Sequence, residues 1–143
     1  DYQLFVVGEG QLKEDIQKQI DNLNLKEAIT LAGKKSRQEL VSLYNQSEIF
    51  IMTSLWEGFP KVLLEAIACG CKVISTEVDS IPNILGKDYK YLIKPMSEKD
   101  VYNAFSRVVL DNKQSFVEQY NDILKKYNWE GIKEDMKQIY LKS

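Results

Sequence analysis

The chain has 143 residues, of which 44% are apolar and 28% are charged, and its formal net charge is −2. These values are typical of a globular domain, and the weakly negative charge argues against a nucleic-acid partner held by bulk electrostatics. No apolar run reaches the length of a membrane span. The chain has no histidine, which removes the commonest metal ligand and the usual general base at neutral pH.

Apolar runs rich in strand formers alternate with helix-like segments along most of the chain. The expected strands are 3–7, 28–32, 48–53, 72–76 and 90–94. The expected helices are 11–22, 37–46, 61–69, 98–110, 114–126 and 130–142. Such alternation predicts an α/β fold, a Rossmann-like parallel sheet with helices on both faces. We predict one domain over residues 1–143, with its core at 1–110 and a helical tail at 111–143.

The first expected strand ends in a glycine-rich turn, Gly8-Glu9-Gly10. This turn resembles half of a dinucleotide-binding fingerprint, but Lys13 stands where a third glycine would be. No well-placed acidic residue ends a following strand either. We therefore interpret the turn as a tight strand-to-helix connection and not as an NAD site.

Two glutamates, Glu57 and Glu65, flank the expected start of the helix at 61–69. Glu57 lies in a turn interrupted by Gly58 and Pro60, and proline supplies the φ favoured at a first helical position. The turn after a strand of a parallel sheet lies at the carboxyl edge, where ligands bind. Two carboxylates, a permissive glycine and a helix N-terminus suited to an anion would meet there. This combination predicts a site for a phosphorylated sugar.

Cys69 and Cys71 are one residue apart, which is not the spacing of a zinc or redox motif. We expect both to be buried thiols. The aromatic residues Trp56 and Phe59 have two interpretations, because they can stack on a sugar or pack into the core beside the strand end.

The segment 54–76 closely resembles the sugar-donor signature S-x-x-E-G-F-P-x-V-x-L-E-A-x-A-x-G-x-P-V-I-x-T of the family-4 glycosyltransferases, also called group 1. These are retaining enzymes of the GT-B fold, and the signature belongs to their C-terminal, donor-binding half. Further segments at 5–13, 29–33 and 39–54 are similar to other parts of that half, in the same order. The resemblance covers roughly residues 3 to 96.

The resemblance implies a role for each matched position. Glu57 would bond hydroxyls of the donor sugar and act as the catalytic residue, and Glu65 would hold the ribose hydroxyls of the nucleotide. The implied donor-binding residues are Glu57, Gly58, Phe59, Pro60, Lys61, Val62 and Glu65. The implied nucleobase pocket lies at Gly33, Lys34 and Lys35.

The activity implied by the resemblance is that of a hexosyl- or glycosyltransferase of class EC 2.4. It would move a sugar, with retention, from a nucleotide-diphosphate sugar to a glycan or lipid acceptor, without metal or cofactor. The full-length protein would be cytoplasmic, with peripheral membrane association, and would serve polysaccharide biosynthesis. An N-terminal half would bind the acceptor. Since Asp1 directly precedes a strand, and the family's basic diphosphate ligands have no counterpart here, we expect an excised piece that is inactive by itself.

Two alternatives remain, namely a non-catalytic GT-B half that acts as a binding or regulatory partner, and a sugar-nucleotide epimerase. The intact pair of glutamates argues against both, because a scaffold has little need for either carboxylate. Glu65 itself has a plainer interpretation, an exposed helix face with Lys61 as its i,i+4 partner.

The chain also departs from the family pattern. Lys72 stands where proline is commonest, which we expect to be harmless at a strand entrance. Asp79-Ser80 replaces a frequent Gly-Gly, and Asn83 replaces a frequent glutamate. We therefore expect this loop to differ in conformation and in donor preference.

Overall fold

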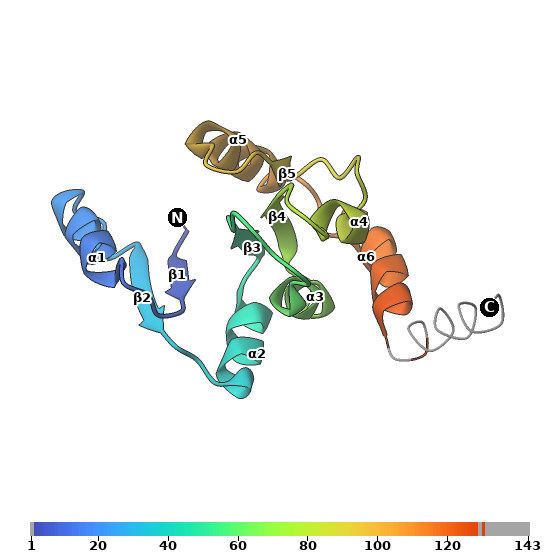
Figure 1. Cartoon of the computed structure of the whole chain (residues 1–143), viewed down its shortest axis with the longest axis horizontal. Coiled ribbons are helices and arrows are strands. Elements are labelled where there is room, and N and C mark those ends of the chain that lie inside the picture. The colour runs from blue at the N-terminus through green and yellow to red at the C-terminus, as the bar shows by residue number, and fades with distance from the viewer. Residues whose placement is uncertain (1, 129, 131–143) are drawn as a thin grey trace. The chain divides into compact units, whose positions relative to one another are not determined.

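The computed structural model describes residues 2–128 and residue 130. The chain forms two compact units, Asp1–Ser42 and Leu43–Ser143 (Figure 1). Strands and helices alternate in both, and every pair of neighbouring strands is parallel. The predicted fold class is therefore confirmed. The expected helix at 130–142 lies outside the described residues, and the domain boundaries given above stay a prediction.

The first unit contains β1 (Leu4–Val7), α1 (Lys13–Asn22), β2 (Ile29–Gly33) and the beginning of α2 (Arg37–Gln46). β1 and β2 form a two-stranded parallel sheet in which Leu4 lies opposite Ile29. The four residues of β1 are between 37% and 45% exposed although all are apolar. α1 buries only Ile20. This unit therefore has little core of its own.

α2 begins at Arg37 because Ser36 and Glu39 form a reciprocal capping box. The Glu39 carboxylate accepts hydrogen bonds from the Ser36 amide at 2.8 Å and from the Ser36 hydroxyl at 2.7 Å. The Glu39 amide donates back to Ser36 Oγ at 3.3 Å. These bonds, together with the Lys35 ammonium 3.2 Å away, lower the pKa of Glu39 to about 2.

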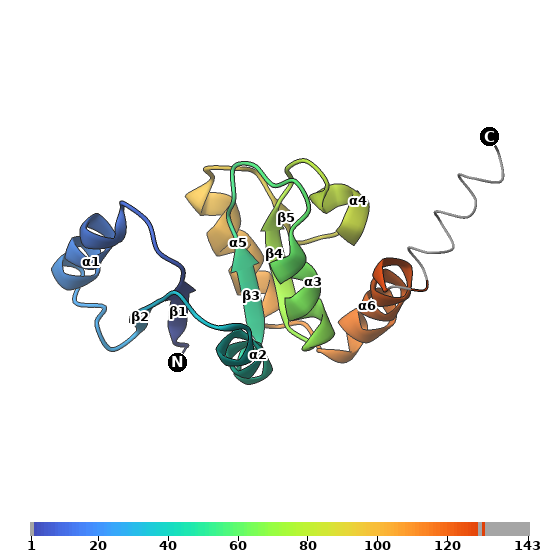
Figure 2. The same ribbon diagram turned by 60° about the horizontal axis from the view of Figure 1, so that its bottom comes forward.

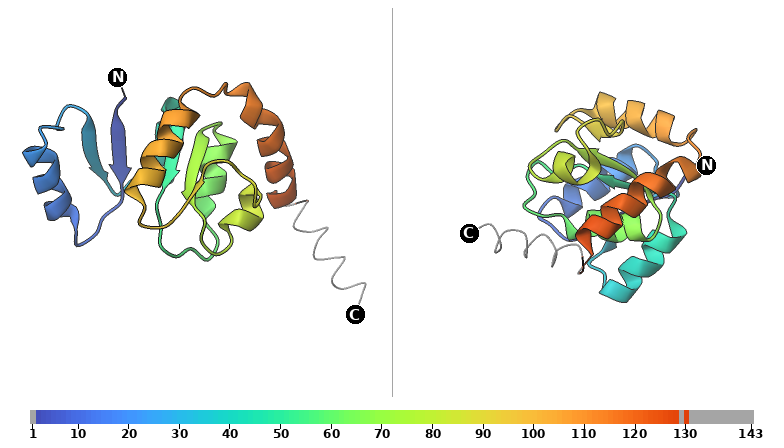
Figure 3. Two further views of the ribbon diagram at one scale, coloured as in Figure 1. Left: turned by 90° about the horizontal axis from the view of Figure 1, so that it is seen from above. Right: turned by 90° about the vertical axis from the view of Figure 1, so that its right-hand side faces the viewer.

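The second unit holds a three-stranded parallel sheet in the order β3-β4-β5, covered by helices on both faces. Its elements are β3 (Ile49–Met52), α3 (Lys61–Ala68), β4 (Lys72–Thr76), α4 (Ile81–Leu85), β5 (Leu92–Ile93), α5 (Glu98–Val108) and α6 (Gln114–Tyr127). α3 and α5 cover opposite faces of the sheet (Figures 2 and 3). α6 packs against α3. All five residues of β4 are buried, so the main core lies around this strand.

β5 is only two residues long, shorter than the expected 90–94, because two tyrosines take over part of its pairing. The Val73 amide of β4 donates to the Tyr120 hydroxyl at 2.9 Å, and the Tyr89 hydroxyl donates to the Val73 carbonyl at 2.7 Å. The two hydroxyl oxygens are 3.1 Å apart. Burial raises the pKa of Tyr120 to about 12 and that of Tyr89 still further above its usual range.

Lys72, in place of the family's proline, has structural consequences at the start of β4. Its amide donates to the Glu48 carbonyl at 2.8 Å, a bond that proline has no N–H to make. Its buried ammonium lies 2.8 Å from the Glu48 carboxylate and 3.2 Å from the Val108 carbonyl. Lys72 thereby joins the sheet to the C-terminal end of α5.

Within the two units, the strands form the pair β1-β2 and the sheet β3-β4-β5. The structure differs from the sequence-based expectation in one other respect. The helix α4 was not predicted, since it has only five residues and carries Pro82 as its second residue. So short a segment shows no helical periodicity in its sequence.

Candidate functional site

The residues 53–60 connect β3 to α3 at the carboxyl edge of the sheet in the second unit. Glu57 lies in this loop and is half-buried. Pro60 is buried and occupies the N-cap of α3, one position earlier than predicted, where its carbonyl accepts from the Leu63 amide at 3.1 Å. The helix therefore starts directly after the loop that carries Glu57.

The carboxylate and the backbone amide of Glu57 are both hydrogen-bonded to other side chains. Its carboxylate accepts a hydrogen bond from Ser54 Oγ at 2.7 Å. Its backbone amide donates to Asp79 Oδ2, also at 2.7 Å. Glu57 is thus fixed by its own loop on one side and by the loop after β4 on the other.

Two further hydrogen bonds join the same two loops. Thr76 Oγ1, at the end of β4, donates to the Ser54 carbonyl at 2.7 Å. Ser80 Oγ donates to the Gly58 carbonyl at 2.8 Å. Together with the bond from Glu57 to Asp79, they give three links between residues 22 apart in sequence. The turn is therefore built by two strand ends, not by its own residues alone.

Glu65 is the fifth residue of α3 and is half-buried. Burial, and after it the negative charge of Glu65, raise the pKa of Tyr44 on α2 to about 12. Within residues 2–128, no ion pair joins Glu65 to Lys61. The plainer interpretation of Glu65, as half of an i,i+4 pair, is therefore not supported.

The aromatic residues of the loop do not pack into the core. Trp56 is 76% exposed and Phe59 is 49% exposed. The Phe59 ring contacts the ring of Tyr127 near the end of α6, with their centroids 5.7 Å apart. Lys61 and Val62, at the start of α3, are exposed as well.

The implied nucleobase residues belong to the first unit, whereas the two glutamates belong to the second. Gly33 ends β2 with a φ of +66°, a left-handed conformation that favours glycine. Lys34 is exposed, and the Lys35 ammonium pairs with Glu39 at 3.2 Å. The contacts named here for the nucleobase residues lie within the first unit, and those of Glu57 lie within the second.

Sequence reasoning missed Ser54, Asp79 and Ser80 as partners of the Glu57 turn. The sequence feature that pointed to this loop was the Asp79-Ser80 pair, which stands where the family usually has Gly-Gly. Hydrogen bonds across 22 residues leave no periodic trace in the sequence, so this signal indicated a changed loop but not its contacts.

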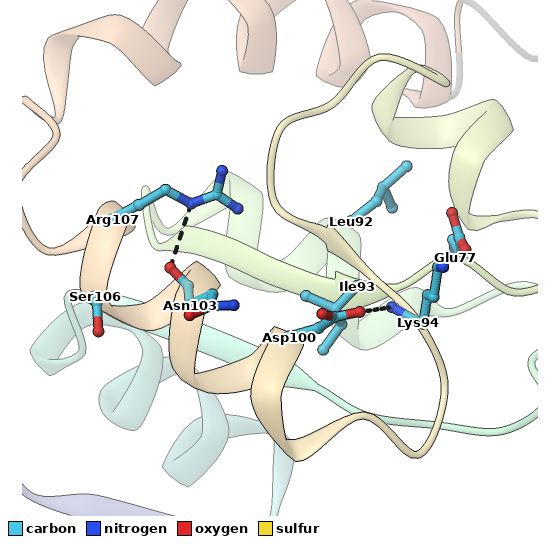
Figure 4. A pocket seen from close by; sticks show the side chains of 8 residues that line it. All are labelled: Glu77, Leu92, Ile93, Lys94, Asp100, Asn103, Ser106 and Arg107. Carbon is cyan, nitrogen blue, oxygen red and sulfur yellow. Dashed lines mark hydrogen bonds between the residues drawn. The ribbon is translucent and has the colours of Figure 1, made fainter.

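A shallow depression lies along β5 and α5 of the second unit (Figure 4). It is lined by Glu77, Leu92, Ile93, Lys94, Asp100, Asn103, Ser106 and Arg107. The Arg107 side chain donates to the Asn103 carbonyl at 3.3 Å, and the Lys94 amide donates to Asp100 at 3.4 Å. Because carboxylates and cations line it together, its charges favour no single class of ligand.

Among the residues that the structure describes, no group of three or more His, Cys, Asp or Glu side chains is placed to hold a metal ion. None of the helices described there has the length and apolar character needed to cross a bilayer.

Two known structures and one curated protein illustrate what the chain is similar to. A lipopolysaccharide outer core galactosyltransferase, WaaB in its apo form, matches 100% of the chain with a TM-score of 0.80 and 24% identity, over 42% of its own length. Anabaena Alr3699/HepE in complex with UDP and glucose matches 99% of the chain with a TM-score of 0.80 and 15% identity, over 41% of its length. These likenesses show the fold, the C-terminal Rossmann-like half of a GT-B glycosyltransferase.

The curated relative is the phosphatidylinositol N-acetylglucosaminyltransferase GPI3 subunit of Saccharomyces cerevisiae, which is 24% identical over 143 residues. The match covers 98% of the chain and 32% of the yeast protein, so the chain spans about a third of this relative's length. Residues 1–139 also match the profile of the family described as Glycosyl transferases group 1. The chain belongs to this glycosyltransferase family.

Proposed function

We propose that this chain is the donor-binding half of a retaining glycosyltransferase. The full protein would transfer a sugar from a nucleotide-diphosphate sugar to a glycan or lipid acceptor. One observation carries the proposal beyond family membership. Glu57, at the carboxyl edge of a parallel sheet, has its carboxylate oriented by Ser54 and its backbone held by Asp79. A fixed carboxylate at this edge suits a ligand rich in hydroxyl groups.

In this proposal the two glutamates have different tasks. Glu57 accepts hydrogen bonds from hydroxyls of the donor sugar at the reacting end. Glu65 receives both hydroxyls of the ribose, which suits the two acceptor oxygens of one carboxylate. The backbone from Gly58 to Val62 approaches the sugar and the diphosphate. The N-terminus of α3, directly after this turn, places partial positive charge where the leaving diphosphate develops negative charge.

The remaining partners follow from the same proposal. Gly33, Lys34 and Lys35 contact the nucleobase, and a separate N-terminal half binds the acceptor. The UDP and glucose bound to the Anabaena protein support a nucleotide-sugar donor. The name of the yeast relative, which refers to phosphatidylinositol, supports a lipid acceptor. A cytoplasmic location and peripheral membrane association of the full protein belong to the same proposal. The isolated chain, without an acceptor half, transfers no sugar.

A pair of charge-neutral substitutions tests the division of labour. Glu65→Gln should weaken binding of the free nucleoside diphosphate and of the nucleotide sugar by similar factors, about tenfold or more, since a hydrogen bond to a charged group contributes about 1.5–3 kcal/mol. Glu57→Gln should weaken binding of the nucleotide sugar alone. The measurement is isothermal titration calorimetry on the full-length protein with UDP, GDP and ADP and their sugar conjugates.

The matched control is Glu118→Gln, an exposed glutamate on α6, which should change neither affinity. Equal effects of Glu57→Gln and Glu65→Gln on both ligands would contradict the assigned roles. If neither substitution changes either affinity, the chain is better described as a non-catalytic GT-B half.

A further inference from the structure

Asp79, in the loop after β4, adopts a backbone conformation that usually belongs to glycine. Its φ is +45°, in the left-handed region where a side chain is disfavoured and where aspartate and asparagine are the most tolerant alternatives to glycine. Glycine, frequent at this position in the family, would adopt the same backbone without strain. The chain therefore carries a strained residue at a position where an unstrained one is available.

The side chain of Asp79 makes a contact that glycine cannot make. Its Oδ2 accepts from the Glu57 amide at 2.7 Å, a short hydrogen bond assisted by the charge of the carboxylate. The next residue, Ser80, donates from Oγ to the Gly58 carbonyl at 2.8 Å. Asp79 and Ser80 thus hold the N–H at one end and the C=O at the other end of a two-residue segment, Glu57-Gly58.

The backbone of this segment has no regular structure to hold it. Residues 53–60 form neither helix nor strand, and Gly58 is exposed. Ser54 orients the Glu57 carboxylate, but a bond at the tip of a side chain does not fix the backbone that carries it. A ligand that must order a loop loses affinity, so a loop fixed in advance binds better.

We propose that Asp79 and Ser80 are positioning residues, which hold the Glu57-Gly58 segment in one geometry for the donor sugar. This inference rests on the proposed donor-binding function. It also narrows what this part of the turn can bind. Because the Asp79 carboxylate already accepts the Glu57 amide and places negative charge beside it, that amide is not a donor to phosphate. Contacts of the turn with the diphosphate therefore come from the residues after Glu57.

Substitutions at both residues test the proposal on the full-length protein. Asp79→Gly should raise the Kd of the nucleotide sugar by about threefold to tenfold, because the ligand must then order a segment that the wild-type protein holds in advance, and should leave the Kd of the nucleoside diphosphate unchanged. Asp79→Asn keeps an acceptor oxygen and tolerates the left-handed φ, so it should recover most of the affinity. Ser80→Ala should have a smaller effect of the same kind. The control Asp88→Gly, at another exposed loop aspartate, should have none.

Two measurements separate positioning from a loss of folding. The Tm of Asp79→Gly should stay close to that of the wild-type protein, because the relief of backbone strain offsets the lost hydrogen bond. The Glu57 amide proton should shift upfield in NMR spectra of Asp79→Gly, because its charge-assisted bond is gone. Equal weakening of both ligands, or a full effect with the Asn variant, would overturn the proposal.

The same measurements separate a failure of the positioning role from a failure of the donor-binding function. If the wild-type protein binds nucleotide sugars and Glu57→Gln weakens that binding while Asp79→Gly does not, the positioning role is wrong and the proposed function stands. If the wild-type protein binds no nucleotide sugar, the proposed function is wrong and this inference with it.

Discussion

β1 in the first unit and β4 in the second are both short parallel strands, yet their surroundings are opposite. β1, with the sequence LFVV, is entirely apolar and entirely exposed. β4, with the sequence KVIST, contains three polar residues and is entirely buried. The difference lies in what covers them. α3 and α5 enclose the sheet that contains β4, whereas α1 contacts β2 and, among the described residues, no helix makes comparable contact with β1.

The comparison shows that the hydrophobicity of a strand does not decide its burial. Parallel sheets are normally covered on both faces, because their crossover helices lie on both sides. In the second unit, helices of that unit cover both faces of the sheet. In the first unit, residues 2–42 do not cover both faces. We therefore expect the two units to differ in stability, and the glutamates of the candidate site belong to the better packed one.

The largest expected difference comes from the same truncation made in each strand. Val73→Ala removes a fully buried side chain from β4 and should lower the free energy of unfolding by about 2–3 kcal/mol. Val6→Ala acts on a side chain that is 37% exposed and should cost less than about 1 kcal/mol. Urea unfolding followed by circular dichroism measures both. Equal costs would mean that β1 is covered in solution.

An intermediate effect is expected from the tyrosine hydroxyls of the second unit. Tyr120→Phe leaves the buried Val73 amide without its partner and should cost about 1–3 kcal/mol at neutral pH. Because the folded pKa of Tyr120 is raised from 10 to about 12, the neutral phenol stabilises the fold fully below pH 10. That contribution should be lost as the pH rises from 10 through 12.

The measurement is urea unfolding between pH 8 and pH 11.5, in the wild-type chain and in Tyr120→Phe. The variant should show a weaker alkaline loss of stability. Tyr102→Phe, at a tyrosine that is 71% exposed, is the control and should behave as wild type. If the free energy of unfolding falls equally with rising pH in the wild type and in Tyr120→Phe, the titration of Tyr120 does not cause the alkaline loss of stability.

The smallest effect is expected in the first unit, at the exposed capping box of α2. The folded pKa of Glu39 is lowered from 4.5 to about 2, so the charged carboxylate stabilises the cap above pH 4.5. The contribution should be lost as the pH falls through 2. The Ser36 amide resonance in NMR spectra should report this transition, with a midpoint near pH 2. Glu39→Gln keeps an acceptor for the cap and should abolish the pH dependence.

Much of the fold could be predicted because it depends on local patterns. The strand at 72–76 and the helix at 37–46 have the predicted bounds, since three β-branched residues favour the strand and a capping box marks the start of the helix. The length of β5 could not be predicted, because Tyr89 and Tyr120 reach Val73 from 16 and 47 residues away. The place of Glu57 after a strand followed from the order of elements, but its hydrogen bond to Asp79 depends on the folded chain.

The tyrosine bonds to Val73 have a further consequence for how this part of the sheet can vary. Two paired strands are in register at consecutive residues, so an insertion in one of them shifts every pair beyond it. At Val73 the partners are instead the hydroxyl groups of two buried tyrosines from separate segments. We therefore expect the exposed stretch 86–88 to gain or lose residues while β4 and β5 stay in register. Natural variation in length should be tolerated there more readily than within β3 or β4.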